Sequence, residues 1–211
     1  MGGLRKPFLE LVGEPVLVHA LRPFLVQTSV VAVVVALAQE DAASPPEWLT
    51  GLDGRISVVA GGETRTESVG RAMAALPADV DVIAVHDAAR PLVTAGVVAE
   101  CIAVAAAGRG AVAGCPAVDT MKEVDGDGYI VATADRSRLW RAHTPQVFPA
   151  SLLREAYETA GSTATDDAAL VERVGGEILM VDAGAWNLKV TRPGDVPVAE
   201  ALLRMRREGD G

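Results

Sequence analysis

Hydrophobic and polar positions alternate along the first half of the chain in blocks whose period switches between helical and extended. Apolar residues recur at helical spacing over 15–27, 64–76 and 94–107. Thr94 is expected to cap the last of these helices, and Cys101 is expected on its inner face. Short apolar runs separate these blocks, and they lie at 29–37, 56–59, 80–85 and 111–115. The runs 29–37 and 79–85 are apolar enough to predict strands buried on both faces. Helices alternating with such strands predict an α/β fold, Rossmann-like, with a doubly wound and mostly parallel sheet.

The pattern changes over 117–143, where two polar, partly alternating segments surround the turn Asp125–Gly128. A DG turn between two such segments is typical of a β-hairpin. These segments are too polar for a protein core, so the sequence predicts a hairpin arm that leaves the sheet.

The elements expected after the arm are shorter. Strands are predicted near 142–148, 178–181 and 188–190, and a helix is predicted over 149–159. Another helix is expected with Thr165 as its cap and Asp166 and Asp167 in its first turn. A final helix starts near Pro193, and its expected inward residues are Val198, Ala201, Leu202 and Met205.

Composition places this chain of 211 residues in a broad class. Half of the residues are hydrophobic, no linker divides the chain, and 1–211 is therefore expected to form one domain. A net charge of −9 argues against nucleic-acid binding through a basic face. No membrane span or signal peptide is indicated. Cys101 and Cys115 lie in apolar surroundings without a CxxC motif, so a cytoplasmic enzyme with buried free thiols is expected.

The most informative motif is the elbow that follows the apolar run 79–85. Asp87 and Arg90 come directly after this predicted strand, in the segment His86–Pro91. In open α/β sheets, ligands bind at the carboxyl ends of the strands. On local grounds, a binding site and a surface ion pair on a turn explain the two residues equally well.

A second candidate is the glycine pair in Gly61–Ser68, which follows a short strand and opens a helix. Paired glycines let a ligand approach the backbone, and a helix N-terminus offers free N–H groups. The spacing is not G-x-G-x-x-G, so a dinucleotide site is not indicated. A plain strand-to-helix turn is the alternative.

The other polar constellations are weak one by one, since each resembles a helix cap, an ion pair or a solvated face. A lone lysine at a strand end, such as Lys189, is usually exposed. These constellations occupy 119–122, 135–136, 140–146, 165–167 and 187–193.

Their order along the chain carries more information than any single motif. HDAARP, DTMK, DR, HTPQ, TDD and NLKVTRP follow one another, with Lys6 ahead of them in LRKPF. This series closely resembles the 2-C-methyl-D-erythritol 4-phosphate cytidylyltransferase family, from about residue 3 to residue 206. Ribitol-5-phosphate cytidylyltransferases share several of the motifs and remain an alternative.

The resemblance implies transfer of a cytidylyl group from CTP to the phosphate of methylerythritol phosphate, with release of pyrophosphate. One phosphate attacks the α-phosphorus of another in line, and no covalent intermediate is needed. Because both reactants are anions, such an enzyme mainly neutralises charge and aligns the reactants.

The resemblance also assigns roles to residues of this chain. It implies that Lys6 and Lys189 are the catalytic lysines at the α-phosphate. Asp87 matches the carboxylate on the ribose side, which is also the expected ligand of a Mg²⁺ cofactor. The remaining nucleotide-binding matches are Gly62, Glu63 and Ser68, and Glu63 departs from the usual aspartate. The matches on the polyol-phosphate side are Arg90, Thr120, Arg136 and Thr144.

The arm has a quaternary role in this family. By the resemblance, Arg136 reaches the active site of the partner subunit, which implies a homodimer with arm exchange. A polar hairpin that protrudes from a compact domain needs something to pack on, and a two-fold partner is a common solution.

The start of the chain departs from the family. The resemblance implies a first strand and an Ala-Ala-Gly-x-Gly-x-Arg phosphate loop, and neither precedes Met1-Gly2-Gly3-Leu4. We therefore expect the natural start to lie about 20 residues upstream. Without a central strand, two strand edges would be left unpaired. A truncated, non-catalytic paralogue is the alternative from a different class.

Overall fold

The structure is a computed structural model that describes residues 8–159 and 164–209. Its strands are β1 (Glu10–Leu11), β2 (Glu14–Pro15), β3 (Val33–Leu37), β4 (Ile56–Ala60), β5 (Val82–Val85), β6 (Gly110–Pro116), β7 (Lys122–Val124), β8 (Ile130–Thr133), β9 (Trp140–Pro149) and β10 (Ile178–Asp182). Its helices are α1 (Val16–Leu25), α2 (Gln39–Ala43), α3 (Glu47–Thr50), α4 (Arg65–Ala74), α5 (Ala95–Ala106), α6 (Ala150–Thr159), α7 (Asp167–Arg173) and α8 (Asp195–Gly209). The chain is thus an α/β protein, as predicted.

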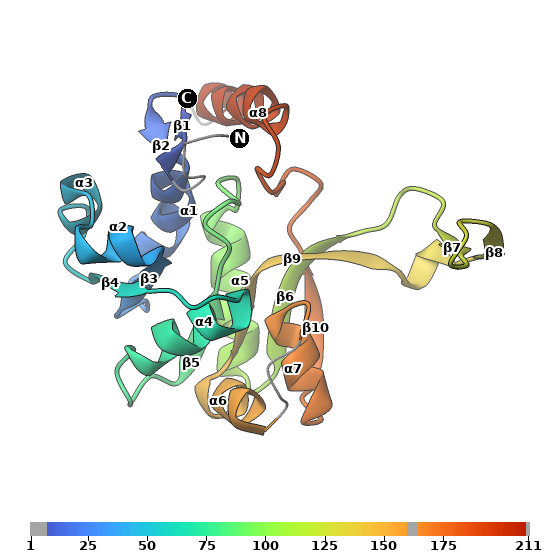
Figure 1. Cartoon of the computed structure of the whole chain (residues 1–211), viewed down its shortest axis with the longest axis horizontal. Coiled ribbons are helices and arrows are strands. Elements are labelled where there is room, and N and C mark those ends of the chain that lie inside the picture. The colour runs from blue at the N-terminus through green and yellow to red at the C-terminus, as the bar shows by residue number, and fades with distance from the viewer. Residues whose placement is uncertain (1–7, 160–163, 210–211) are drawn as a thin grey trace.

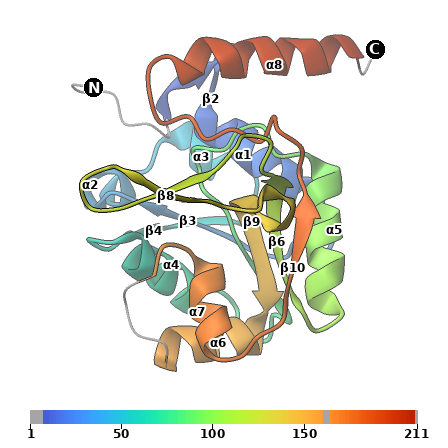
Figure 2. The same ribbon diagram turned by 90° about the vertical axis from the view of Figure 1, so that its right-hand side faces the viewer.

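The main sheet has the strand order β10-β6-β9-β5 (Figure 1). β10 pairs with β6 in parallel, whereas β9 is antiparallel to both of its neighbours. Helix α5 packs on one face of this sheet, and α6 and α7 pack on the other (Figure 2). The predicted mostly parallel, doubly wound sheet is therefore confirmed. The exception is β9, which runs back from the arm without a crossover helix.

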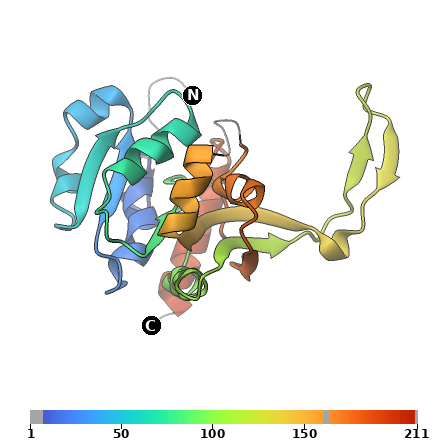
Figure 3. The ribbon, with the colours of Figure 1, turned by 90° about the horizontal axis from the view of Figure 1, so that it is seen from below.

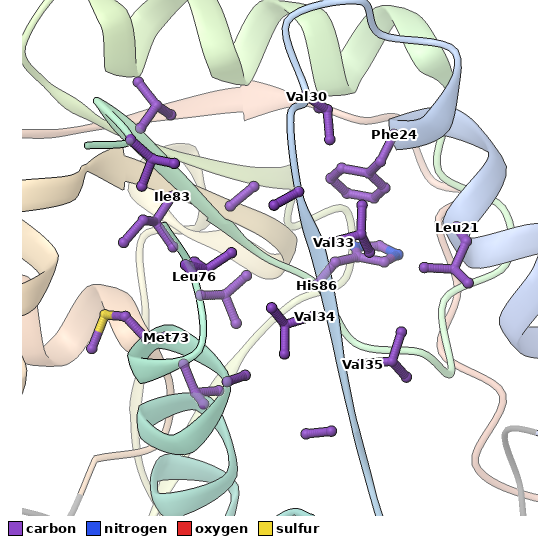
Figure 4. A pocket seen from close by; sticks show the side chains of 18 of the residues that line it. Leu21, Phe24, Val30, Val33, Val34, Val35, Met73, Leu76, Ile83 and His86 are labelled. Atoms are coloured by element: carbon purple, nitrogen blue, oxygen red, sulfur yellow. The ribbon is translucent and has the colours of Figure 1, made fainter. Parts of the chain in front are cut away.

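β3 and β4 form a separate parallel sheet, in which Val33 pairs with Ile56. A cavity of about 690 Å³ lies between this pair and β5, and α1 and α4 contribute to its lining. Figure 4 shows the β3 valines on one side of the cavity and Ile83 of β5 across from them. Within the described residues, β3 and β5 each have one edge without a strand partner.

This cavity explains one wrong prediction. The runs 29–37 and 79–85 were expected to be buried on both faces, yet Ala36 of β3 and Ala84 of β5 are exposed. Both alanines line the cavity. The two apolar runs therefore flank an open space in which no described strand covers them.

Side chains close the amino ends of several helices. Thr94 caps α5 by accepting a hydrogen bond from the Val97 N–H at 3.3 Å, as predicted. The predicted cap of α7 is off by one residue, because Asp166 rather than Thr165 accepts from the Ala169 N–H at 3.0 Å. Both residue types suit an N-cap, and only the backbone path selects between them.

The C-terminal helix α8 packs through a different stripe from the predicted one. Ala199 is fully buried against Leu11 and Leu92, whereas Val198 and Met205 are about half exposed. Leu202 does pack against this cluster, and the predicted Ala201 is exposed. Two sets of apolar residues at helical spacing lie on α8, and the packing of the helix on the protein buries one of them. In the described part of the chain, no helix has both the length and the apolar character needed to cross a membrane.

β7 and β8 pair as an antiparallel hairpin that projects from the body of the protein (Figures 1 and 3). The turn is closed by a hydrogen bond from the Gly128 N–H to the Asp125 carbonyl, and Gly128 has a φ of +88°. Every residue of β7 and β8 is exposed. The hairpin described here occupies the predicted arm region 117–143.

Candidate active site

The elbow after β5 is held by a closed set of hydrogen bonds. The Arg90 N–H donates to the Asp87 carbonyl at 2.9 Å, which makes the turn. The Asp87 N–H donates to the Thr144 hydroxyl at 2.9 Å, and this oxygen lies 3.0 Å from Nδ1 of His86. Nε2 of His86 lies 3.1 Å from the Arg90 carbonyl. These contacts fit a neutral imidazole that donates from Nε2 and accepts at Nδ1.

Burial supports the same protonation state of His86. It lowers the pKa of this histidine to about 4, and the Arg90 charge adds to that effect against the opposing influences of the Arg90 carbonyl and Asp87. His86 therefore stays neutral at neutral pH, and the hydrogen bonds that hold the elbow around Asp87 do not change there.

Asp87 is surrounded by three cations. Its Oδ2 lies 2.8 Å from Nζ of Lys189 and 3.7 Å from Nε of Arg90. Its Oδ1 lies 3.5 Å from Nε of Arg65. Burial alone would raise the pKa of Asp87, but the hydrogen bond and charge of Lys189, with the two arginine charges, outweigh burial and lower it.

The alternative of a surface ion pair is wrong for this elbow. The side chains of Asp87 and Arg90 are only 17% and 11% exposed. Three cations face two carboxylates, Asp87 and the Asp167 partner of Arg65, and leave a net positive charge, while the chain as a whole carries −9. Such a local excess suits an anionic ligand.

Lys189 reaches the elbow from the segment between β10 and α8. A strand was predicted over 188–190, but these residues form no strand, because the backbone instead crosses to the elbow. There the Val190 N–H donates to the Ala89 carbonyl at 2.8 Å. The Nζ of Lys189 is thereby aimed at Asp87, and its side chain stays 42% exposed.

Asn187 ties the same segment to the two other parts of the site. Its side-chain amide donates to the Thr144 carbonyl at 3.0 Å, and its backbone carbonyl accepts from Nη1 of Arg90 at 2.8 Å. Asn187 is 1% exposed. The segment is therefore fixed at its base while Lys189 remains accessible.

The glycine loop precedes α4 and is held together by its own side chains. The Gly62 N–H donates to the Ser68 hydroxyl at 3.0 Å, and the Glu63 N–H donates to the Glu67 carboxylate at 2.9 Å. A Cβ on Gly62 would lie 2.3 Å from that of Glu67, so a larger residue does not fit there. Gly62 and Ser68 thus lie together, and Glu63 is exposed beside them.

Not every predicted site residue meets at the elbow. Thr120 is exposed in the arm region, and Arg136 lies on the short 3-10 helix η2 (Arg136–Arg138) at the base of the arm. The guanidinium of Arg136 donates to the carbonyl of Val118, another arm residue. Lys6 lies outside the described residues. Within one chain, the structure therefore joins Asp87, Arg90, Thr144 and Lys189 and leaves Thr120 and Arg136 on the arm.

Sequence reasoning noted Asp167 within the TDD motif but gave no role to Arg65, its partner in the structure. Nη2 of Arg65 lies 2.7 Å from Oδ2 of Asp167, whose side chain is fully buried, and the Tyr157 hydroxyl donates to Oδ1 of Asp167 at 2.6 Å. One signal could have found Arg65: it is the first residue of α4, where a cation opposes the helix dipole. An arginine at this position therefore indicates a contact with another segment of the chain.

The described residues offer few ligands for a metal ion. Within residues 8–159 and 164–209, no cluster of three or more His, Cys, Asp or Glu side chains could hold a metal ion. Mg²⁺ commonly binds through one or two carboxylates and otherwise through phosphate oxygens and water. The partly accessible carboxylate of Asp87 fits that pattern as a single ligand.

Sequence comparison agrees with the residue order noted above. The family model described as 2-C-methyl-D-erythritol 4-phosphate cytidylyltransferase matches residues 1–205. The protein of that name from Acidobacterium capsulatum is 40% identical over 210 residues, covering 95% of this chain and 88% of the relative. The protein of that name from Symbiobacterium thermophilum is 42% identical over 206 residues, covering 96% and 86%.

Solved structures of proteins with the same activity in their names are also similar to this chain. The 2-C-methyl-D-erythritol 4-phosphate cytidylyltransferase of Thermus thermophilus is 36% identical with a TM-score of 0.82, and 94% of each chain is covered. The 4-diphosphocytidyl-2C-methyl-D-erythritol synthase of Anaerococcus prevotii has a TM-score of 0.87 at 26% identity, covering 97% of this chain and 92% of that one. Together with the polar elbow on this fold, these matches show that the chain belongs to the 2-C-methyl-D-erythritol 4-phosphate cytidylyltransferase family.

Proposed function

We propose that this cytidylyltransferase transfers the cytidylyl group of CTP to 2-C-methyl-D-erythritol 4-phosphate and releases pyrophosphate, in the synthesis of isoprenoid precursors. The observation that carries the proposal is the convergence of Lys189, Arg90 and Arg65 on Asp87 at the carboxyl end of β5. The relatives' names favour methylerythritol phosphate over ribitol phosphate as the acceptor.

Charge neutralisation is the main chemical task of such a site. The attacking phosphate and the α-phosphate repel one another, and the transition state adds negative charge at the α-phosphorus. Lys189 is accessible and mobile enough to leave Asp87 and meet that charge, since its ammonium is a point charge on a flexible stem. Lys6 is proposed for the same phosphate from the other side.

The neighbouring groups orient the reactants. Asp87 faces the ribose, and the loop with Gly62, Glu63 and Ser68 is proposed to read the cytosine. Arg90 binds on the acceptor side, and Thr144 holds the elbow beneath it through the Asp87 N–H. When Mg²⁺ is bound, with Asp87 as its protein ligand, it neutralises phosphate charge.

The arm supports a homodimer with arm exchange. Its exposed apolar side chains include Val124, Tyr129, Ile130 and Val131, each more than half exposed. We propose that a second copy of the chain covers them and that Thr120 and Arg136 thereby reach the partner's acceptor site. Two buried free cysteines suit a reducing compartment and support a cytoplasmic location.

The experiment is a pyrophosphate-release assay on the purified chain with CTP, Mg²⁺ and 2-C-methyl-D-erythritol 4-phosphate. We expect release that depends on all three components, with ribitol 5-phosphate and with ATP, GTP and UTP as specificity controls. Release with ribitol 5-phosphate alone would assign the other polyol. The absence of both CTP binding by calorimetry and turnover would favour the non-catalytic alternative.

A further inference from the structure

The Asp87 carboxylate is approached from two sides by groups with different freedom to move. Lys189 lies on the Oδ2 side, is 42% exposed and has no other ion-pair partner among the described residues. Arg65 lies on the Oδ1 side, is 35% exposed and also binds Asp167. In the described part of the chain, Lys189 is therefore held by Asp87 alone, whereas Arg65 is also held by Asp167.

Asp167 makes Arg65 the fixed one of the pair. The side chain of Asp167 is fully buried, and a buried carboxylate needs a partner charge and hydrogen bonds. Arg65 supplies the charge at 2.7 Å, and the Tyr157 hydroxyl supplies a hydrogen bond at 2.6 Å. Moving Arg65 would strip Asp167 of its counter-ion, whereas moving Lys189 exposes an already accessible ammonium to water.

The chemistry of the link requires arginine in particular. Nε of Arg65 faces Asp87 while Nη2 binds Asp167, so two different nitrogens of one planar group address two carboxylates. A lysine has a single charged nitrogen at the end of its stem. It could keep one of these contacts but could not hold both in this geometry.

The geometry points to Arg65 as a positioning residue, which fixes the Asp87 carboxylate from Asp167 so that Lys189 can leave for a phosphate. This inference rests on the proposed function, because it assigns Asp87 to the nucleotide and the metal. Arg65 itself acts through Asp87 rather than on the reacting atoms.

Arg65→Lys is the informative variant, since it retains a charge for Asp167 and tests the two-carboxylate link. We expect its affinity for CTP with Mg²⁺, measured by calorimetry, to fall at least about tenfold, because small misplacements at a reacting centre are costly. Its melting temperature should stay within about 2 °C of the parent's. Arg109→Lys, at an exposed turn after α5, is the matched control and should bind as the parent does.

A double-mutant cycle separates this role from a structural one. If Arg65 acts through Asp87, Arg65→Lys should weaken binding no further in an Asp87→Asn background, whereas an independent effect would add. A crystal structure of Arg65→Lys should show the Asp87 carboxylate displaced from its position in the parent.

Three results would overturn the inference: parent-like binding by Arg65→Lys, additivity in the cycle, or an unmoved Asp87 in the crystal structure. Failure of the parent chain itself to bind CTP or to release pyrophosphate would instead count against the proposed function. The displacement of Asp87 can be measured in either case, so the two failures are distinguishable.

Discussion

The elbow and the hairpin arm are both polar, yet distant segments of the chain stabilise the elbow, whereas local strand pairing stabilises the arm. Asp87 contacts two cations on other elements, and one of these, Lys189, lies 102 residues away in the sequence (189 − 87). The arm is a two-stranded ladder whose seven β residues are all exposed. An isolated hairpin of this kind is marginally stable in water. The elbow is held by contacts between distant segments, whereas β7 and β8 pair with each other.

This difference divides the candidate site between two kinds of residue. Among the described residues, the groups proposed for the nucleotide, namely Asp87, Lys189 and the loop with Gly62 and Ser68, are held by contacts within the chain. Two of the groups proposed for the acceptor, Thr120 and Arg136, are exposed residues of the arm region. Variants of the two regions should therefore fail differently.

The largest effect is expected in the elbow. Lys189→Ala should lower kcat about 10²- to 10³-fold, since it removes a charge that matters most in the transition state. The KM for CTP should change much less, because ground-state binding retains Asp87 and the loop with Gly62 and Ser68. Steady-state pyrophosphate release would measure both constants. A defect confined to KM would contradict the role given to Lys189.

The next effect concerns the arm as a dimer contact. Ile130→Glu with Val131→Glu places two charges on side chains that are each more than 60% exposed in the single chain. We expect a monomer by light scattering and an activity loss of at least about tenfold, because charges oppose burial in an apolar interface. Unfolding of the body should be unaffected. Because consecutive residues of a strand point to opposite faces, a parent-like dimer would show that neither of these side chains lies in the interface.

Arg136 tests whether the site is shared. Arg136→Ala should raise the KM for the polyol phosphate about tenfold or more and leave CTP binding unchanged. When Arg136→Ala and Lys189→Ala subunits are mixed in equal amounts, half the dimers are mixed and each has one intact site. About a quarter of the parent activity should then return. An additive, unrecovered loss would indicate that Arg136 serves its own chain.

An effect of a different kind, on the free energy of unfolding rather than on activity, is expected from pH. Burial lowers the pKa values of His86 and His143 to about 4, so unfolding lets them bind protons that the folded state refuses. Stability should therefore be complete above pH 6.5 and fall as pH drops toward 4, by about 2 kcal/mol for each histidine at pH 5. Urea unfolding at pH 7.5 and pH 5 measures this change. Replacing His143 with Asn should remove about half of it.

The sequence predicted the local structure well where one periodicity dominates. The helix 94–107 was expected with Thr94 as cap and Cys101 facing inward, and α5 has both features. It failed where two local solutions were equally good, as with Thr165 against Asp166 or the two stripes of α8. Local propensity cannot separate such pairs, because their energies differ only after docking.

The candidate site follows the same rule. The ordered motifs identified Asp87, Arg90 and Lys189, and the structure brings them together. Arg65 was missed because its role depends on Asp167, a carboxylate 102 residues away that becomes buried only in the folded chain. Thr144 stays a prediction for the acceptor side, and the structure adds a contact that the sequence did not predict, in which its hydroxyl accepts from the Asp87 N–H.

The sequence by itself determined the alternation of elements and the hairpin. These depend on periodicity and on turn and cap chemistry, which act over a few residues. Only the tertiary structure decided that β3 and β5 border a cavity, that β9 runs against its neighbours, and that Arg65 links two carboxylates. These features depend on contacts between distant segments, whose free energy appears only when the chain has folded.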